Sequence, residues 1–228
     1  MKWTEVPAGR INAATQRFWV ALGDNADTVA RRIVDDDGFV VHLAAFAVDP
    51  GFGDKALTSL NPQWLRARAI MGKNFFGVEE AIKHFGVSPS KSQIVTLAEV
   101  PFTKEVLAEC KDTHILAAVF PISILDVRSR VKRQLFHSHE NSWYNRKEFA
   151  KARGEVGWQL VRKTPVPDST SRTWQEQQTL LTENEVTPTT QVMVYAIIGH
   201  FLATRERLFQ NIYVRCADTS GDFRVSVG

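Results

Sequence analysis

The chain has 228 residues, of which 44% are hydrophobic and 23% are charged, with 28 Lys and Arg set against 25 Asp and Glu. These values are those of an average globular protein, and they exclude disordered, collagen-like and coiled-coil chains. The net charge of +3 is too small to indicate a nucleic-acid or membrane partner by itself. A chain of this length folds as one large domain or as two small ones.

Targeting signals and cysteines point to a cytoplasmic protein. The N-terminus has a charge at Glu5 and no apolar core of the kind found in secretory signals. The longest uncharged apolar stretch, 115–125, is well short of the roughly 20 residues that a membrane helix needs. Cys110 and Cys216 are too few for a disulfide framework or a four-cysteine zinc site. We therefore expect two reduced thiols and no membrane association.

The first forty residues are predicted to form helices. Apolar residues recur at helical spacing over 13–22, and Val29 and Ile33 form the apolar face of a second helix. The run 39–46 is short, β-rich and bounded by turn residues, and therefore predicts a buried strand before a loop at 49–54.

The middle of the chain reads as a series of short helices followed by a strand. Asn61 and Pro62 are typical of a helix start, and Gly72 of its end. Two helices near 78–85 and 90–98 follow, then one capped by Thr103, and then a second buried strand at 114–120.

The rest of the chain mixes helices and strands. Basic residues dominate 128–153, within which 143–153 is predicted as a helix. Further elements are a strand at 156–161, a polar helix from 171 or 173 to 181, an apolar helix at 188–204, and strands 212–216 and 223–227 joined by a turn at 218–222. The prediction is an α+β protein with a mostly helical region, 1–113, and an α+β region, 114–228; a single domain remains the alternative.

The segment 77–97 has the pattern of a helix-turn-helix DNA reader, with a glycine turn and Ser-Pro-Ser opening a second helix. Its candidate DNA contacts are Lys83, Ser90, Lys91 and Gln93. Such motifs need a small residue four positions before the glycine, where this chain has Ile82, and the second helix has a single basic residue. An ordinary helix pair is therefore favoured, nucleic acid is a disfavoured partner, and a DNA-binding regulator is kept as an alternative function.

A second alternative is a metal-dependent hydrolase built on His137, His139 and Glu140. Alternating histidines on a strand point the same way, as metal ligands must. Because no further ligand-type residue recurs at ligand spacing nearby, a hydrated surface loop is the favoured interpretation. His200, on the apolar 188–204 element, is interpreted as a hydrogen-bonded core histidine.

The sequence contains no motif of a familiar enzyme class. It has no G-x-G-x-x-G, P-loop, G-x-S-x-G or H-E-x-x-H pattern, so we predict no catalytic residue and no cofactor. The basic segment 128–153 carries aromatic residues, a mixture that can serve single-stranded nucleic acid. The helical spacing of Trp143, Lys147 and Lys151 equally describes an amphipathic helix with a solvated face.

Three stretches carry a family resemblance: 110–130, 157–167 and 200–228. They resemble the constant part of the target proteins of diversity-generating retroelements. That resemblance implies a C-type-lectin-like fold in the C-terminal half, and a non-enzymatic ligand-binding or scaffold protein whose partner is an unknown protein or small ligand. In such a fold the constant elements fix the backbone, which leaves exposed side chains free to vary.

The same resemblance implies that Val227 and Gly228 lie at the end of the constant part. In the family, a strand ending in Val-Gly is followed by the hypervariable segment that displays the binding residues. The sequence runs to Gly228, the position after which that segment would begin. The resemblance thus implies that residues up to this point are the fixed scaffold, and it assigns no binding residue among them.

Overall fold

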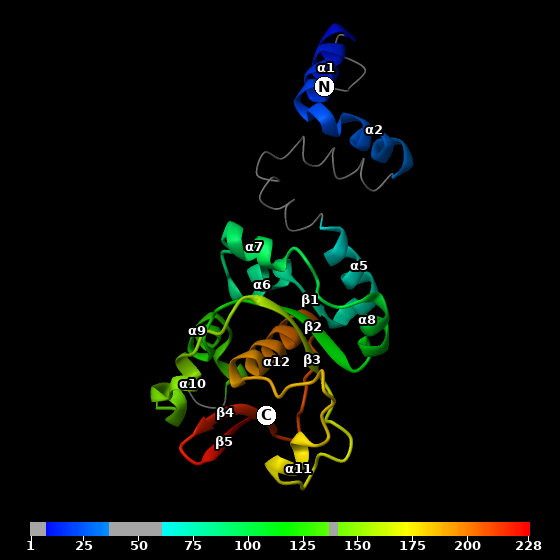
Figure 1. Ribbon diagram of the computed structural model, residues 1–228. Helices are drawn as coiled ribbons and strands as arrows, with labels where there is room; N and C mark the ends of the chain where they lie inside the picture. The colour runs from blue at the N-terminus through cyan, green and yellow to red at the C-terminus, as the bar shows by residue number, and fades with distance from the viewer. Residues whose placement is uncertain (1–7, 37–60, 137–140) are drawn as a thin grey trace. The chain divides into compact units, whose positions relative to one another are not determined.

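The computed structural model describes residues 8–36, 61–136 and 141–228 (Figure 1). The chain divides into two units, Met1–Leu57 and Thr58–Gly228. The strand predicted at 39–46 and the loop predicted at 49–54 lie outside the described residues.

The described part of the first unit is helical. Helix α1 spans Ala8–Leu22, a 3-10 turn η2 spans Gly23–Asn25, and α2 spans Ala26–Asp35. The predicted helices are thus confirmed, and Val29 and Ile33 are half-buried on α2. No residue of α2 is fully buried.

The second unit contains both helices and strands. Before residue 137 its elements are α5 (Pro62–Met71), η3 (Gly72–Asn74), β1 (Phe75–Phe76), α6 (Val78–Phe85), α7 (Lys91–Leu97), α8 (Lys104–Cys110), β2 (His114–Val119), α9 (Ile124–Arg130) and η4 (Arg133–Leu135). After residue 140 they are η5 (Trp143–Arg146), α10 (Glu148–Lys151), β3 (Gly157–Arg162), α11 (Trp174–Gln178), α12 (Thr190–Thr204), β4 (Val214–Ser220) and β5 (Phe223–Val227). The predicted α+β class is confirmed.

Local chemistry explains where several helices begin and end. The Asn61 side chain accepts hydrogen bonds from the amides of Gln63 and Trp64, at 2.9 and 3.3 Å, ahead of Pro62 in the first turn. Thr103 caps α8 in the same way. Gly86 ends α6 at φ 61°, a left-handed conformation that glycine adopts without a Cβ penalty. These boundaries follow the prediction closely.

A three-stranded sheet in the order β1-β2-β3 forms the centre of the unit. β1 runs parallel to β2, and β3 runs antiparallel to it, from His114 opposite Arg162 to Val119 opposite Gly157. All six residues of β2 are buried, so both faces of the sheet are covered. Because β1 and β2 pair across the predicted boundary at residue 113, the segments on either side share one sheet, and the units divide between Leu57 and Thr58 instead.

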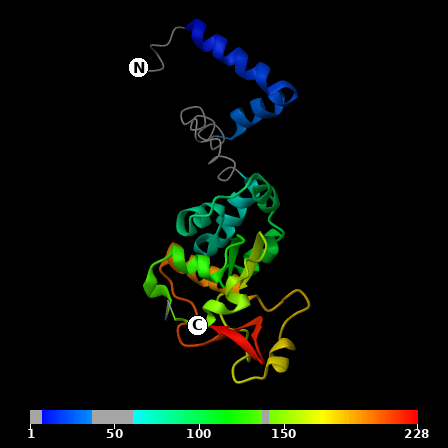
Figure 2. The ribbon, with the colours of Figure 1, turned by 90° about the vertical axis from the view of Figure 1, so that its left-hand side faces the viewer.

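Layers of helix and strand cover the two faces of the sheet (Figures 1 and 2). On one face Trp158 contacts Trp64 of α5, with ring centroids 6.1 Å apart. On the other face Tyr195 of α12 donates to the carbonyl of Ala118 at 2.9 Å, and its ring meets Phe85 of α6. None of the helices in the described ranges is both long enough and apolar enough to cross a membrane.

The β4–β5 hairpin lies on the far side of α12 from the sheet (Figure 1). Cys216 of β4 is fully buried among Met193 and Ala196 of α12 and Val161 of β3. Short α11 contacts the exposed outer face of the hairpin, where the Arg224 guanidinium lies 4.0 Å from the centroid of the Trp174 ring. The described part of the unit is therefore a stack of helices, sheet, helices and hairpin.

Three local differences from the prediction have physical causes. The predicted helix 143–153 is broken at Lys147, whose extended backbone lets Phe149 and Ala150 of α10 enter the core. Helix α9 was not predicted; a capping box between Ser123 and Asp126 starts it. β4 continues to Ser220, so the hairpin turn is shorter than the one predicted at 218–222.

Candidate functional site

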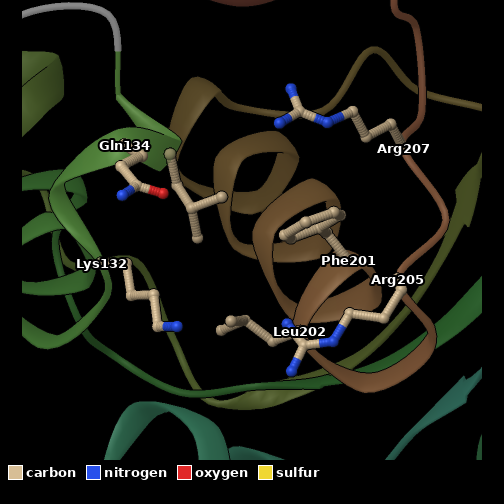
Figure 3. A pocket seen from close by; sticks show the side chains of 7 residues that line it. Lys132, Gln134, Phe201, Leu202, Arg205 and Arg207 are labelled. Carbon is tan, nitrogen blue, oxygen red and sulfur yellow. The ribbon is translucent and has the colours of Figure 1, made fainter.

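A cavity of about 230 Å³ lies beside the C-terminal end of α12 (Figure 3). One wall is the segment around η4, and the other is the last turn of α12 with the residues that follow it. The lining residues are Lys132, Gln134, Leu135, Phe201, Leu202, Arg205 and Arg207. We call this cavity the basic pocket.

The lining of the basic pocket joins positive charge to an apolar floor. Leu135, Phe201 and Leu202 are half-buried and supply the floor. The guanidinium carbons of Arg207 and Arg205 lie 5.3 and 5.9 Å from the centroid of the Phe201 ring, within the range of cation–π contact. In the described ranges, no carboxylate forms an ion pair with either arginine or with Lys132. The described lining thus offers positive charge beside a flat apolar surface, with no ion partner for that charge among the described residues.

The end of α12 places the two arginines. The amide of Arg205 donates to the carbonyl of Phe201 at 2.8 Å, and Arg205 itself has φ 67°, the left-handed conformation that usually selects glycine. The Thr204 hydroxyl donates to the carbonyl of His200 at 2.8 Å and accepts from the amide of Glu206 at 3.1 Å. These bonds turn the chain sharply after α12.

Glu206 lies between the two pocket arginines and points to a different set of partners. Its carboxylate is 2.7 Å from the Nζ of Lys73 and 3.8 Å from the Nζ of Lys163. The hydrogen bond from Lys73 holds the pKa of Glu206 below its ordinary value, so the carboxylate is ionised at neutral pH. Along the chain, Glu206 thus lies between two arginines that line the pocket, while its own carboxylate is held by lysines from other elements of the unit.

His200 completes this anchor from α12. Its side chain is 1% exposed, as expected of a core histidine, and burial lowers its pKa, so the ring is neutral at pH 7. Its Nε2 lies 3.6 Å from the nearer oxygen of Glu206, too far for a hydrogen bond. The predicted burial is confirmed, and Nε2 has no hydrogen-bond partner among the described residues.

The four candidate DNA contacts lie on α6, α7 and the turn between them. Ser90 and Gln93 form a capping box, in which each side chain accepts from the other residue's amide, at 3.3 and 2.9 Å. Their polar groups thus start α7. Lys83 and Lys91 are exposed, and α7 has seven residues. DNA binding by this segment stays a prediction. Of its four candidate contacts, only Lys83 and Lys91 have side chains that are not engaged in capping α7.

The candidate metal ligands His137, His139 and Glu140 lie outside the described residues. Within the ranges that are described, no group of three or more His, Cys, Asp and Glu side chains could hold a metal ion. Burial raises the pKa of the Cys216 thiol to about 11, so this thiol is protonated and unreactive at neutral pH.

The aromatic residues of the basic segment divide between core and surface. Phe149 is buried, Tyr144 is half-buried under the guanidinium of Arg128, and Trp143 is 61% exposed. The predicted continuous helical face through Trp143, Lys147 and Lys151 does not form, because Lys147 separates η5 from α10.

Sequence reasoning missed the basic pocket. The signal was the alternation Arg-Glu-Arg at 205–207 directly after an apolar helix, which sends a central carboxylate and two flanking guanidiniums in different directions. No protein-family model matches the chain, and neither a curated protein nor a solved structure matches it.

Proposed function

We propose that the protein is a non-enzymatic binding protein whose basic pocket takes a small anionic ligand with a flat apolar part. The observation that carries the proposal is that the Arg205 and Arg207 guanidiniums lie beside the half-buried ring of Phe201, in a cavity that Lys132 also lines. A phosphate or carboxylate pairs with guanidinium groups through charge-assisted hydrogen bonds. An aromatic or other flat group beside that anion would cover Phe201 and Leu202.

The composition of the pocket supports binding rather than catalysis. Among the described residues, the lining side chains are guanidinium, ammonium, amide and hydrocarbon groups, with no carboxylate, imidazole, thiol or hydroxyl. Such a set can neutralise a negative charge, but it lacks the usual general base and nucleophile. The volume of about 230 Å³ is below that of most drug-sized ligand sites, so we propose a small ligand such as an aryl phosphate or aryl carboxylate.

The C-terminal resemblance described above supports the same class of function. A scaffold for binding needs a rigid body that holds exposed side chains, and the described part of the second unit has such a body. Its sheet is covered on both faces, and α12, whose end forms the pocket, is buried along most of its length. We propose, as part of the same function, that the C-terminal half has a lectin-like fold and that this fold serves as a scaffold for ligand binding.

Titration calorimetry with phenyl phosphate at low salt tests the proposal. Phenyl phosphate should bind more tightly than either inorganic phosphate or phenol, because it alone engages both the cations and the Phe201 ring. Arg207→Ala should weaken binding about tenfold, which corresponds to roughly 1.4 kcal/mol for a lost charged hydrogen bond. Lys91→Ala, which removes an exposed cation from α7, is the matched control and should bind as the wild type does.

Two results would contradict the proposal. One is the absence of phenyl phosphate binding to the wild-type chain. The other is equal weakening by Lys91→Ala and Arg207→Ala, which would indicate general attraction to a basic protein rather than a site. Added salt should weaken binding without abolishing the preference for phenyl phosphate over inorganic phosphate, since the apolar contact is not screened.

A further inference from the structure

We infer that Glu206 is a positioning residue of the basic pocket, which holds a strained turn so that Arg205 and Arg207 flank Phe201. This inference rests on the proposed function and deepens it. It assigns the placement of two cations, Arg205 and Arg207, to a half-buried carboxylate that forms no ion pair with either of them. Three features support it: the strain in the turn, the anchor that opposes this strain, and the alternation that links the anchor to the pocket.

The turn after α12 adopts a conformation that its residue disfavours. Arg205 has φ 67° and Phe209 has φ 52°, so two non-glycine residues within one short segment are left-handed. A residue with a Cβ reaches this conformation only when its surroundings impose it. A glycine at position 205 would end the helix without strain, yet the guanidinium that Arg205 brings to the pocket would then be lost.

The anchor that imposes the turn comes from three separate elements. Lys73 follows α5 in η3, Lys163 follows β3, and His200 lies on α12, and all three face the Glu206 carboxylate. The Lys163 side chain is 11% exposed and also donates to the Oδ1 of Asn74 at 3.2 Å. Lys163 is nearly buried and is held by Asn74, so it places a second cation near the carboxylate, at 3.8 Å.

The order Arg205, Glu206, Arg207 along the chain links this anchor to the pocket, because fixing Glu206 also fixes the backbone of its two neighbours. Arg205 and Arg207 stand on either side of Glu206 along the chain and direct their side chains to the cavity (Figure 3). Glu206 contacts none of the lining groups through an ion pair in the described part of the chain; its ion partners are Lys73 and Lys163, and the neutral ring of His200 lies beside them. Removing its charge would therefore free the turn and displace the two arginines, while every ligand-contacting side chain is still present.

The test compares Glu206→Gln with Glu185→Gln in the full chain, with phenyl phosphate as the probe. Glu185 is a matched control, because it forms a comparable ion pair with Arg162 at 2.7 Å and lies outside the pocket lining. Both variants should lower the thermal midpoint. Glu206→Gln should weaken phenyl phosphate binding about fivefold or more, whereas Glu185→Gln should leave the dissociation constant unchanged.

A coupling measurement separates positioning from general destabilisation. Glu206→Gln should weaken binding less in an Arg207→Ala background than in the wild type, because part of its effect is exerted through Arg207. Equal effects in the two backgrounds, or unchanged binding by Glu206→Gln, would overturn the inference. If the wild-type chain binds no phenyl phosphate, the proposed function fails first, and the two failures are thus distinct.

Two further variants keep the inference testable if Glu206→Gln does not fold. Lys73→Met removes the 2.7 Å partner of Glu206 at a side chain that is 65% exposed, so the fold should persist while binding weakens. Arg205→Gly should raise the thermal midpoint by relieving the left-handed strain and should also weaken binding. Tighter or unchanged binding by Lys73→Met, or a lower midpoint for Arg205→Gly, would count against the inference.

Discussion

The indole rings of Trp64 and Trp158 meet edge to face, and both indole N–H groups donate to the carbonyl oxygen of Leu97, at 2.6 and 2.9 Å. This shared acceptor joins α5, the end of α7 and β3 on one face of the sheet. It also explains how Leu97, the last residue of a short helix, satisfies a carbonyl that the helix itself leaves without a partner.

A double-mutant cycle on these tryptophans should show strong coupling. Trp64→Phe or Trp158→Phe alone leaves the Leu97 carbonyl with one indole donor, whereas the double variant leaves it buried with none. An unsatisfied buried carbonyl costs about 1–3 kcal/mol. We therefore expect the double variant to lose more free energy of unfolding than the sum of the single variants, as measured in urea. Simple additivity would show that water replaces the indoles.

Gly199→Ala should destabilise the second unit. A Cβ at Gly199 would lie 2.9 Å from the ring of Phe76, which is 2% exposed and enclosed by Tyr195 and Phe85. Overpacking of this kind costs about 1–3 kcal/mol. Gly157→Ala is the control, since nothing lies within 4 Å of its Cβ position. The stability of each variant is measured by thermal or denaturant unfolding. If Gly199→Ala loses no more stability than Gly157→Ala, α12 can shift away from β1 and make room for the added Cβ.

Mild acid should destabilise the fold through its histidines. Burial is the largest cause of the lowered pKa values of His84, His114 and His200, which are 6.5 in the absence of the fold. A folded pKa below the unfolded one means that the unfolded chain binds more protons, so the stability is fully present above pH 6.5 and declines as the pH falls toward the folded values.

The measurement is the free energy of unfolding at several pH values above the carboxylate range. Glu206 and Glu185 have pKa values below 4.5 and therefore contribute only in stronger acid. His200→Gln should flatten the decline between pH 6.5 and that range, whatever its effect on the absolute stability. A slope identical to that of the wild type would show that His200 accepts its proton as easily in the folded chain as in the unfolded one.

The resemblance to retroelement targets makes a prediction about genomic DNA. Nucleotides after codon 228 should encode a short repeat that varies at adenine positions, with a reverse transcriptase gene close by. Sequencing downstream of this codon in the source genome provides the check. If neither feature is present, the retroelement interpretation is removed, while binding at the basic pocket remains testable by calorimetry.

Local chemistry was sufficient to predict much of the second unit. Asn61 and Thr103 start helices because their side chains satisfy backbone amides a few residues away, which is visible in a short window of sequence. The buried strand ending near residue 119 was equally clear from its unbroken apolar run. β1 escaped prediction because two residues show no periodicity, and only its pairing with β2 makes it a strand.

The basic pocket could not be predicted in the same way. Its shape depends on Arg205 adopting a left-handed conformation and on an ion pair between Lys73 and Glu206, which are 133 residues apart. Neither the dihedral angle of Arg205 nor a contact between residues so far apart can be recognised in a short window of sequence. The alternation of charge at 205–207 was visible, yet without the fold it did not show which side faced a cavity.

The late position of α12 has a consequence for synthesis on the ribosome. Phe76, Phe85 and Ala118 belong to the first half of the second unit, but the ring that packs against both phenylalanines and the hydroxyl that reaches Ala118 belong to Tyr195. Until residues 190–204 have been synthesised and have left the ribosome, α12 is missing and one face of the sheet is exposed to water. We therefore expect translation pauses before this helix to produce intermediates that chaperones retain and that aggregate when released early.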